Sequence, residues 1–220
     1  MSAQRGQDGL LSPDSVLHRA ADRLAHQFAG MVSEETVERV VFESYTALAR
    51  TAAVSTHLPT VAEKFARDRL VALAQSRGLI AKPVPEILYV CVQNSGRSQM
   101  AAAITRHLGG DRVHVRSAGS QPAAGLLPGV VTVLEEAGID VAEEFPKPLT
   151  DDVVRAADAV VTMGCGDACP LYPGKRYLYW QLDDPAELDL DGIRTVRDEI
   201  QQHVEQLLTE LTPGLTATRT

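Results

Sequence analysis

Cys91 and Arg97 are the two residues of this chain that most clearly suggest catalysis. They stand at the ends of the segment Cys91-Val-Gln-Asn-Ser-Gly-Arg97, and Ser98 follows directly. A thiolate is a strong nucleophile, and one guanidinium can hold two oxygens of the same anion. Together these side chains suggest a site that binds an oxyanion and attacks its central atom.

The sequence on either side of this segment indicates how it is held. The run Glu86-Ile-Leu-Tyr-Val-Cys91 is apolar enough for a buried strand, and Ser98-Gln-Met-Ala-Ala-Ala-Ile favours a helix. A turn between them directs backbone N–H groups and the positive end of the helix dipole toward one point. That cradle would bind an anion and stabilise the Cys91 thiolate, with Ser98 as a further donor to the sulfur. The alternative interpretation is that Cys91 and Arg97 have no catalytic role, so that Cys91 is a buried cysteine at a strand end and Arg97 an ordinary helix arginine.

We expect the loop backbone and its side chains to form the substrate site. Asn94 favours a tight, partly left-handed turn, and Gly96 lets the backbone approach an anion closely. Both are also common in turns that have no other function. The predicted substrate-binding residues are Val92, Gln93, Asn94, Ser95, Gly96, Arg97 and Ser98.

After Pro85 the sequence alternates between strand and helix patterns. Strands are expected at 87–92, 112–116, 159–163 and 176–181, and helices at 98–108, 128–137, 151–156 and 192–211. This alternation predicts a doubly wound, four-stranded parallel sheet of the α/β class, which binds ligands at the carboxyl ends of its strands. Cys91 lies at such an end, so the fold and the proposed site agree.

Before the α/β region the pattern is helical. Three amphipathic segments lie between Ser15 and Gly78: one ends near Gly30, one is capped by Ser33, and one follows Pro59. They predict a small three-helix bundle. The expected organisation is a flexible N-terminus at 1–14, the bundle at 15–78, a linker at 79–85, the α/β domain at 86–212 and a flexible tail at 213–220.

Composition narrows the classes of function. Hydrophobic residues make up 45% and charged residues 23% of the 220, and no apolar run reaches the ~20 residues that span a bilayer. The net charge of −8 argues against nucleic acid as the main partner. The three cysteines all lie in the second half, which favours redox or metal chemistry in a reducing cytosol over extracellular disulfides. We therefore expect a cytoplasmic protein, and the absence of a long apolar run predicts no membrane partner.

Residues 86–212 resemble the low-molecular-weight protein tyrosine phosphatases, and more closely the arsenate reductases built on that fold. The likeness rests on the cradle segment, on Ser117-Ala-Gly-Ser and on Asp183-Asp184-Pro185. It implies that Asp184 is the general acid, although two acidic residues before a proline also form an ordinary turn. Asp183 is expected to be solvated or to cap the loop. We further expect Ser117 to hydrogen-bond to the cradle. Arg116 is expected to be a solvated strand end, and the alternative is that its side chain faces the site.

Cys165 and Cys169 distinguish a reductase from a phosphatase, because only reduction needs further thiols. Their surroundings, Val161-Thr-Met-Gly-Cys165-Gly-Asp-Ala-Cys169-Pro, resemble the actinobacterial reductases and imply an arsenical-detoxification enzyme with arsenate as substrate. We expect Cys165 to attack the Cys91 adduct and Cys169 to resolve the resulting disulfide. The alternative is that both cysteines are buried and inert. A metal site is not expected, because no histidine pair has a suitable spacing.

The sequence leaves more than one possibility for the external reductant and for the reaction. The relay implies thioredoxin, but the Cys-x3-Cys spacing departs from the Cys-x6-Cys of thioredoxin-coupled relatives, so mycothiol with a glutaredoxin-like mycoredoxin is the other external thiol reductant. No bound cofactor is expected. The alternative enzyme is a phosphatase that hydrolyses phosphate monoesters through a phosphocysteine. A non-enzymatic oxyanion sensor is a third reading, and a general acid argues against it.

Overall fold

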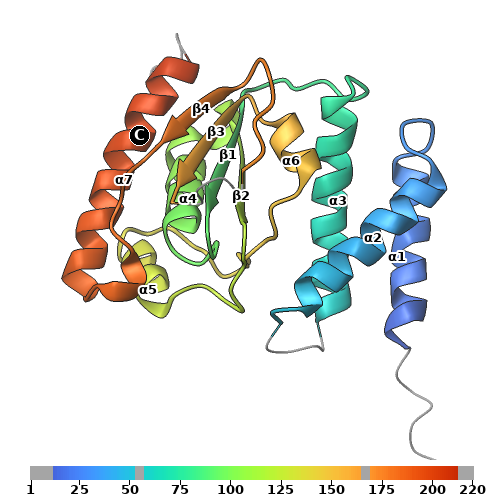
Figure 1. Cartoon of the computed structure of the whole chain (residues 1–220), viewed down its shortest axis with the longest axis horizontal. Coiled ribbons are helices and arrows are strands. Elements are labelled where there is room, and N and C mark those ends of the chain that lie inside the picture. Colours follow the sequence, from blue (N-terminus) through green and yellow to red (C-terminus); the bar gives the residue numbers. More distant parts are fainter. Residues whose placement is uncertain (1–11, 53–56, 165–168, 213–220) are drawn as a thin grey trace, which may run out of the picture. The chain divides into compact units, whose positions relative to one another are not determined.

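The computed structural model describes residues 12–52, 57–164 and 169–212. The chain forms two compact units, Met1–Ala74 and Gln75–Thr220 (Figure 1). Residues 1–11 and 213–220, most of the two ends predicted to be flexible, lie outside the described residues, and so does Cys165. The predicted domain bounds, 15–78 and 86–212, stay predictions.

The first unit is helical, as its amphipathic pattern predicts. It contains α1 (Pro13–Gln27), α2 (Glu34–Ala49) and most of α3 (Leu58–Ser76). Ser12 and Ser33 cap α1 and α2 by accepting hydrogen bonds from the backbone N–H groups of Ser15 and Thr36. The first helix therefore starts two residues before the expected Ser15. Buried apolar side chains join the helices, and Leu17, Phe28, Phe65 and Leu70 are among them.

The second unit contains the predicted four-stranded parallel sheet, with strand order β2-β1-β3-β4. The strands are β1 (Glu86–Cys91), β2 (His114–Gly119), β3 (Ala159–Met163) and β4 (Arg176–Tyr179). In the ladders Cys91 pairs with Gly119 on one side and Met163 on the other. The nucleophile candidate therefore lies at the carboxyl end of a central strand, where doubly wound sheets bind their ligands.

Helices cover both faces of this sheet. Its helices are α4 (Arg97–Gly109), α5 (Pro128–Glu136), α6 (Asp151–Ala156) and α7 (Leu190–Leu211). Alternate residues of a strand point to opposite faces, and Ile87, Tyr89 and Cys91 of β1 share one core with side chains of α4, α5 and α7. In Figure 1, α6 lies on the other side of the sheet from α7. The predicted doubly wound α/β fold is confirmed.

The prediction for Arg116 is wrong. The strand runs from His114 to Gly119, not from 112 to 116, so Arg116 lies inside it, opposite Leu88. Its side chain is buried, and its Nε donates to Glu86 Oε1 at 2.5 Å. A buried arginine requires a hydrogen-bonded partner, and the carboxylate of Glu86 provides it.

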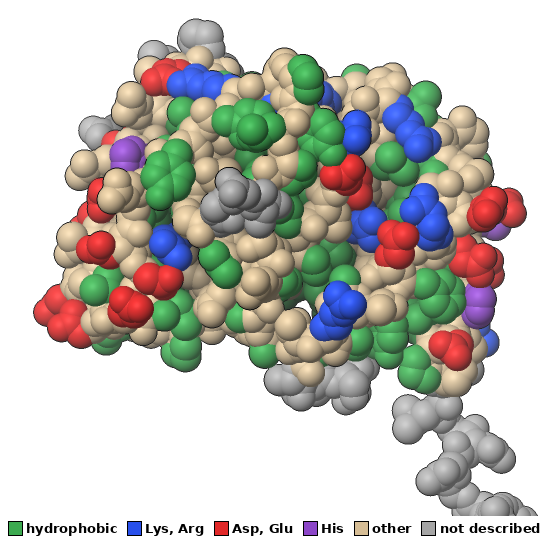
Figure 2. All heavy atoms as spheres, viewed as in Figure 1, with side chains coloured by type: hydrophobic (Ala, Val, Ile, Leu, Met, Phe, Trp, Pro, Cys, Tyr) green, Lys and Arg blue, Asp and Glu red, His purple; other side chains and the backbone are tan. Residues whose placement is uncertain are grey.

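In the described residues no helix is a candidate membrane span, and the face shown in Figure 2 has no continuous basic stripe. None of the helices in the described part of the chain is both long and apolar enough to cross a bilayer. On the face shown in Figure 2, basic side chains are interspersed with acidic ones. An electrostatic footprint for a nucleic acid is therefore not seen on this face.

Candidate active site

Cys91 ends β1 at the base of the loop that leads into α4. The residue is buried, and two donors lie near its sulfur. Ser98 Oγ is 2.9 Å from Cys91 Sγ, and the backbone N–H of Asn94 donates to the same sulfur at 3.2 Å. Hydrogen bonds to a sulfur favour its charged form. This geometry supports the predicted role of Ser98 as a donor to the thiolate.

The loop is held in a conformation that few residues adopt. Asn94 has φ of 49° and is fully buried. Gly96 is the N-cap of α4, so the first backbone N–H groups of that helix follow the cradle directly. Unpaired N–H groups and the helix dipole together attract an anion to this point. The left-handed turn predicted at Asn94 is present.

Arg97 and Asp184 meet at the mouth of the cradle. Arg97 Nη2 donates to Asp184 Oδ2 at 2.7 Å, and Arg97 Nη1 donates to the carbonyl of Leu182 at 3.3 Å. The other carboxylate oxygen of Asp184 accepts the backbone N–H of Ala186 at 3.1 Å. Both Asp183 and Asp184 are exposed, but only Asp184 lines the pocket. The aspartate that directly precedes Pro185 is therefore the one at the pocket.

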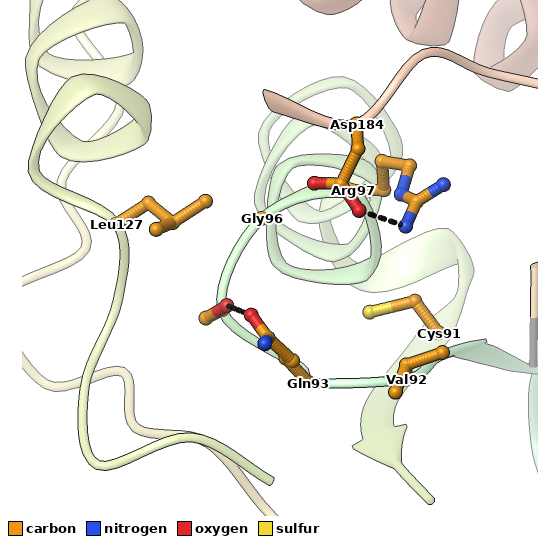
Figure 3. Close-up of a pocket in the computed structure, with 8 residues that line it drawn as sticks. Cys91, Val92, Gln93, Gly96, Arg97, Leu127 and Asp184 are labelled. Carbon is orange, nitrogen blue, oxygen red and sulfur yellow. Dashed lines mark hydrogen bonds and ion pairs between the residues drawn. The ribbon is translucent and has the colours of Figure 1, made fainter. Parts of the chain in front are cut away.

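A pocket of about 170 Å³ opens above the cysteine. Pockets for drug-sized ligands have roughly 300–1,000 Å³, so this one suits a small anion. Its lining is Cys91, Val92, Gln93, Ser95, Gly96, Arg97, Leu127 and Asp184 (Figure 3). In Figure 3, Leu127 lies across the pocket from Cys91, on the segment that precedes α5. Sequence reasoning missed Leu127, because a leucine before a proline carries no functional signal.

The predicted substrate-binding residues divide into two groups. Five of them line the pocket: Val92, Gln93, Ser95, Gly96 and Arg97. Asn94 and Ser98 do not line it; they are fully buried and contact each other and the cysteine. Their contacts indicate support of the loop and of the sulfur, not contact with the anion.

Among the described residues, Ser117 does not form the hydrogen bond to the cradle that the sequence predicts. Ser117 Oγ is buried, and within the described residues it has no hydrogen-bond partner. Gly119 of the same segment supports the cradle instead. A Cβ on Gly119 would lie 2.7 Å from the Val92 carbonyl oxygen and 2.9 Å from Asn94 N. The loop thus packs on a backbone position that only glycine leaves open.

Two further polar groups reach Asn94 from outside the loop. Gln99 Nε2 donates to Asn94 Oδ1 at 3.1 Å, and the backbone N–H of Lys147 donates to the same oxygen at 2.8 Å. Neither residue could be singled out from the sequence, because a glutamine in a helix is common and a backbone N–H group is present at almost every position.

The structure describes only one of the two distal cysteines of the expected relay. Cys169 is buried, and Cys165 lies outside the described residues. Gly164, which ends the described segment, has φ of 79°, and a Cβ there would be 3.5 Å from Arg97 Nη1. The chain thus passes beside the guanidinium of the cradle one residue before Cys165.

Two family models match the chain. Residues 86–215 match low molecular weight phosphotyrosine protein phosphatase, and residues 17–74 match the N-terminal domain described as protein-tyrosine-phosphatase-like. The first match contains every residue of the cradle and Asp184.

Solved structures and curated relatives agree with this result. The thioredoxin-dependent arsenate reductase Cg_ArsC1' of Corynebacterium glutamicum is 47% identical with a TM-score of 0.82, and the match covers 91% of this chain and 98% of that one. A putative arsenate reductase of Halobacterium salinarum is 35% identical over 130 residues, which cover 57% of this chain and 92% of the relative. The YwlE arginine phosphatase of Geobacillus stearothermophilus is 26% identical with a TM-score of 0.51, and the match covers 58% of this chain and 92% of that one.

Proposed function

Since the chain belongs to the low-molecular-weight phosphotyrosine protein phosphatase family, we propose that it is an arsenate reductase that converts arsenate to arsenite. One observation carries the proposal. The sulfur of Cys91 lies in a small anion pocket beside Arg97, and the segment that leads to the next cysteine passes the same guanidinium at Gly164. The 47% identity to an arsenate reductase across 91% of the chain supports it.

In the first step Cys91 is the nucleophile. Its thiolate attacks the arsenic(V) of arsenate and forms a sulfur–arsenic bond, while Arg97 and the loop N–H groups hold the remaining oxygens. The hydroxyl on the opposite side leaves, and Asp184 gives it a proton so that it departs as water. The hydrogen bond between Arg97 and Asp184 at the pocket supports this role for Asp184.

In the second step thiols supply two electrons. The Cys165 thiolate attacks Cys91 Sγ, a Cys91–Cys165 disulfide forms, and the electron pair of the sulfur–arsenic bond remains on arsenic. Arsenic(V) thereby becomes arsenic(III), which leaves as arsenite. Cys169 then attacks Cys165, which releases the Cys91 thiolate and leaves a Cys165–Cys169 disulfide.

Thioredoxin is the external reductant that we propose for this disulfide, because the relative Cg_ArsC1' is a thioredoxin-dependent enzyme. Mycothiol with mycoredoxin is the alternative, and it would attack the arsenic adduct without the distal cysteines. Either route needs reduced thiols, so we place the enzyme in the cytoplasm.

Arsenate turnover with each reductant tests this function. The experiment compares the thioredoxin–thioredoxin reductase couple with the mycothiol–mycoredoxin couple for the unmodified chain and for Cys91→Ser, Cys165→Ser and Cys169→Ser. We expect Cys91→Ser to abolish turnover with both couples. Cys165→Ser and Cys169→Ser should abolish turnover with the thioredoxin couple but not with the mycothiol couple. Turnover that persists in all three variants would reject the relay and the nucleophile together.

A phosphatase activity is the second candidate, and the family match favours it. Hydrolysis of a phosphate monoester would use Cys91, Arg97 and Asp184 in the same roles, with water in place of the second thiol. Turnover of a chromogenic aryl phosphate measures this activity. If it exceeds arsenate reduction and survives the loss of both distal cysteines, the phosphatase reading replaces the reductase.

A further inference from the structure

Gln99 is a fully buried polar residue in the first turn of α4, next to Ser98. Its Nε2 donates to the carbonyl oxygen of Phe145 at 3.0 Å and to Asn94 Oδ1 at 3.1 Å. Its own Oε1 has no hydrogen-bond partner within the described part of the chain. A buried amide with an unsatisfied oxygen costs free energy that an apolar residue would avoid. The two hydrogen bonds that Gln99 donates therefore indicate a role for this residue beyond packing.

Two backbone groups orient the carboxamides of Gln99 and Asn94. The Phe145 carbonyl can only accept, so the nitrogen of Gln99 must face it. The Lys147 N–H can only donate, so the oxygen of Asn94 must face it, at 2.8 Å. When both carboxamides are oriented in this way, the nitrogen of Gln99 faces the oxygen of Asn94. Gln99 therefore donates a hydrogen bond to Asn94, and neither carboxamide needs to be flipped.

The orientation of Asn94 determines which way Ser98 donates. Asn94 Nδ2 lies 2.8 Å from Ser98 Oγ and can only donate, so Ser98 accepts there. The hydroxyl hydrogen of Ser98 is then free to point at Cys91 Sγ, 2.9 Å away. A donated hydrogen bond stabilises a thiolate, whereas an accepted one would stabilise the neutral thiol.

We propose that Gln99 is a positioning residue for Cys91. It holds the carboxamide of Asn94 in the orientation that makes Asn94 donate to Ser98 and Ser98 donate to the sulfur. The inference rests on the proposed function only in taking Cys91 as a thiolate nucleophile, and it holds equally for arsenate and for a phosphate ester.

Alkylation of Cys91 by iodoacetamide tests the proposal without any substrate. The rate is followed across pH by mass spectrometry of the Cys91 peptide, in the full chain and in Gln99→Met, which keeps the side-chain length and removes the donors. We expect the rate at pH 7 to fall about threefold to tenfold, the effect of losing about one hydrogen bond, and the pH midpoint to rise. The charged groups that line the pocket, Arg97 and Asp184, are unchanged.

Two controls separate positioning from loss of structure. Thr105→Val removes another buried hydroxyl of α4, which bonds to Tyr89 and not to the cradle, and should leave the pH midpoint unchanged even if the melting temperature falls. In a Ser98→Ala background, Gln99→Met should have little further effect, because the proposed route passes through Ser98. An unchanged midpoint in the single variant, or an equal shift in the Ser98→Ala background, would overturn the proposal. Loss of arsenate turnover alone would bear on the proposed function and not on Gln99.

Discussion

Arg97 forms an ion pair with Asp184 at the mouth of the pocket, with 2.7 Å between Nη2 and Oδ2. This guanidinium nitrogen is one that a bound oxyanion would also use. The anion and Asp184 therefore compete for the same donor. Binding of the anion would release the carboxyl group at the moment when it is needed to protonate the leaving group.

Asp184→Asn should have opposite effects on catalysis and on anion binding, because it removes both the general acid and the charge that competes for Arg97. We expect kcat to fall by ~10²–10⁴, the usual contribution of a general acid. Affinity for inorganic phosphate should rise a few-fold, because the competing charge is gone. Steady-state kinetics and titration calorimetry measure the two effects. Asp183→Asn, at the exposed neighbour, is the matched control and should change neither. Equal effects of both substitutions would refute the assignment of the acid.

Arg97→Lys should weaken anion binding while keeping the charge. A lysine cannot hold two oxygens in the fixed geometry of a guanidinium. Loss of about one charge-assisted hydrogen bond corresponds to ~1.5–3 kcal/mol, or roughly tenfold to a hundredfold in affinity. Calorimetric titration with phosphate measures the change, and unchanged affinity would mean that the loop N–H groups alone hold the anion.

Gly119→Ala should displace the cradle loop, against which Gly119 packs. The new Cβ would meet backbone atoms of Val92 and Asn94 at 2.7–2.9 Å, and backbone cannot move aside cheaply. We expect a loss of ~1–3 kcal/mol in the free energy of unfolding, together with a marked fall in Cys91 alkylation. Gly125→Ala is the matched control, because nothing lies within 4 Å of its Cβ position. Similar effects of both would show that the loop tolerates displacement.

Glu86 should make stability depend on acid pH. Burial alone would raise the pKa of Glu86, but the neighbouring His114 and Arg116 outweigh it and leave the pKa lowered. A lowered pKa means that the carboxylate contributes stability above the unfolded value of ~4.3, and that the contribution is lost as pH falls through the folded value. Urea unfolding of Glu86→Gln across pH 3 to 7 should show a shallower acid dependence.

The same substitution should also lower stability at neutral pH. Removing one partner of a buried ion pair costs ~3–5 kcal/mol, because Arg116 is left without its carboxylate. Glu136→Gln, which breaks the exposed pair with Arg194, is the control and should have a much smaller effect. Comparable losses in both variants would contradict the view that Glu86 stabilises the strand pair β1–β2.

The sequence was sufficient for features that depend on neighbours in the chain. The apolar run before Cys91 and the helical residues after Arg97 predict a strand and a helix, so the loop between them had to form a strand-to-helix turn. The bounds of β2 were predicted less well. The pattern of this strand continues through Ser117-Ala-Gly119, where small residues do not distinguish a strand from a turn.

Only the tertiary structure decided which distant groups meet at the site. Asp184 lies 87 residues after Arg97, and their contact depends on the order of the strands and on the path of the loop after β4. The Lys147 N–H meets Asn94 for the same reason, and Gly119 reaches the loop through the ladder of β1 with β2. The spacing of residue types along a chain determines local conformation. Contacts between distant residues depend on how the elements pack, and the residues around each partner do not indicate which other residue it will meet.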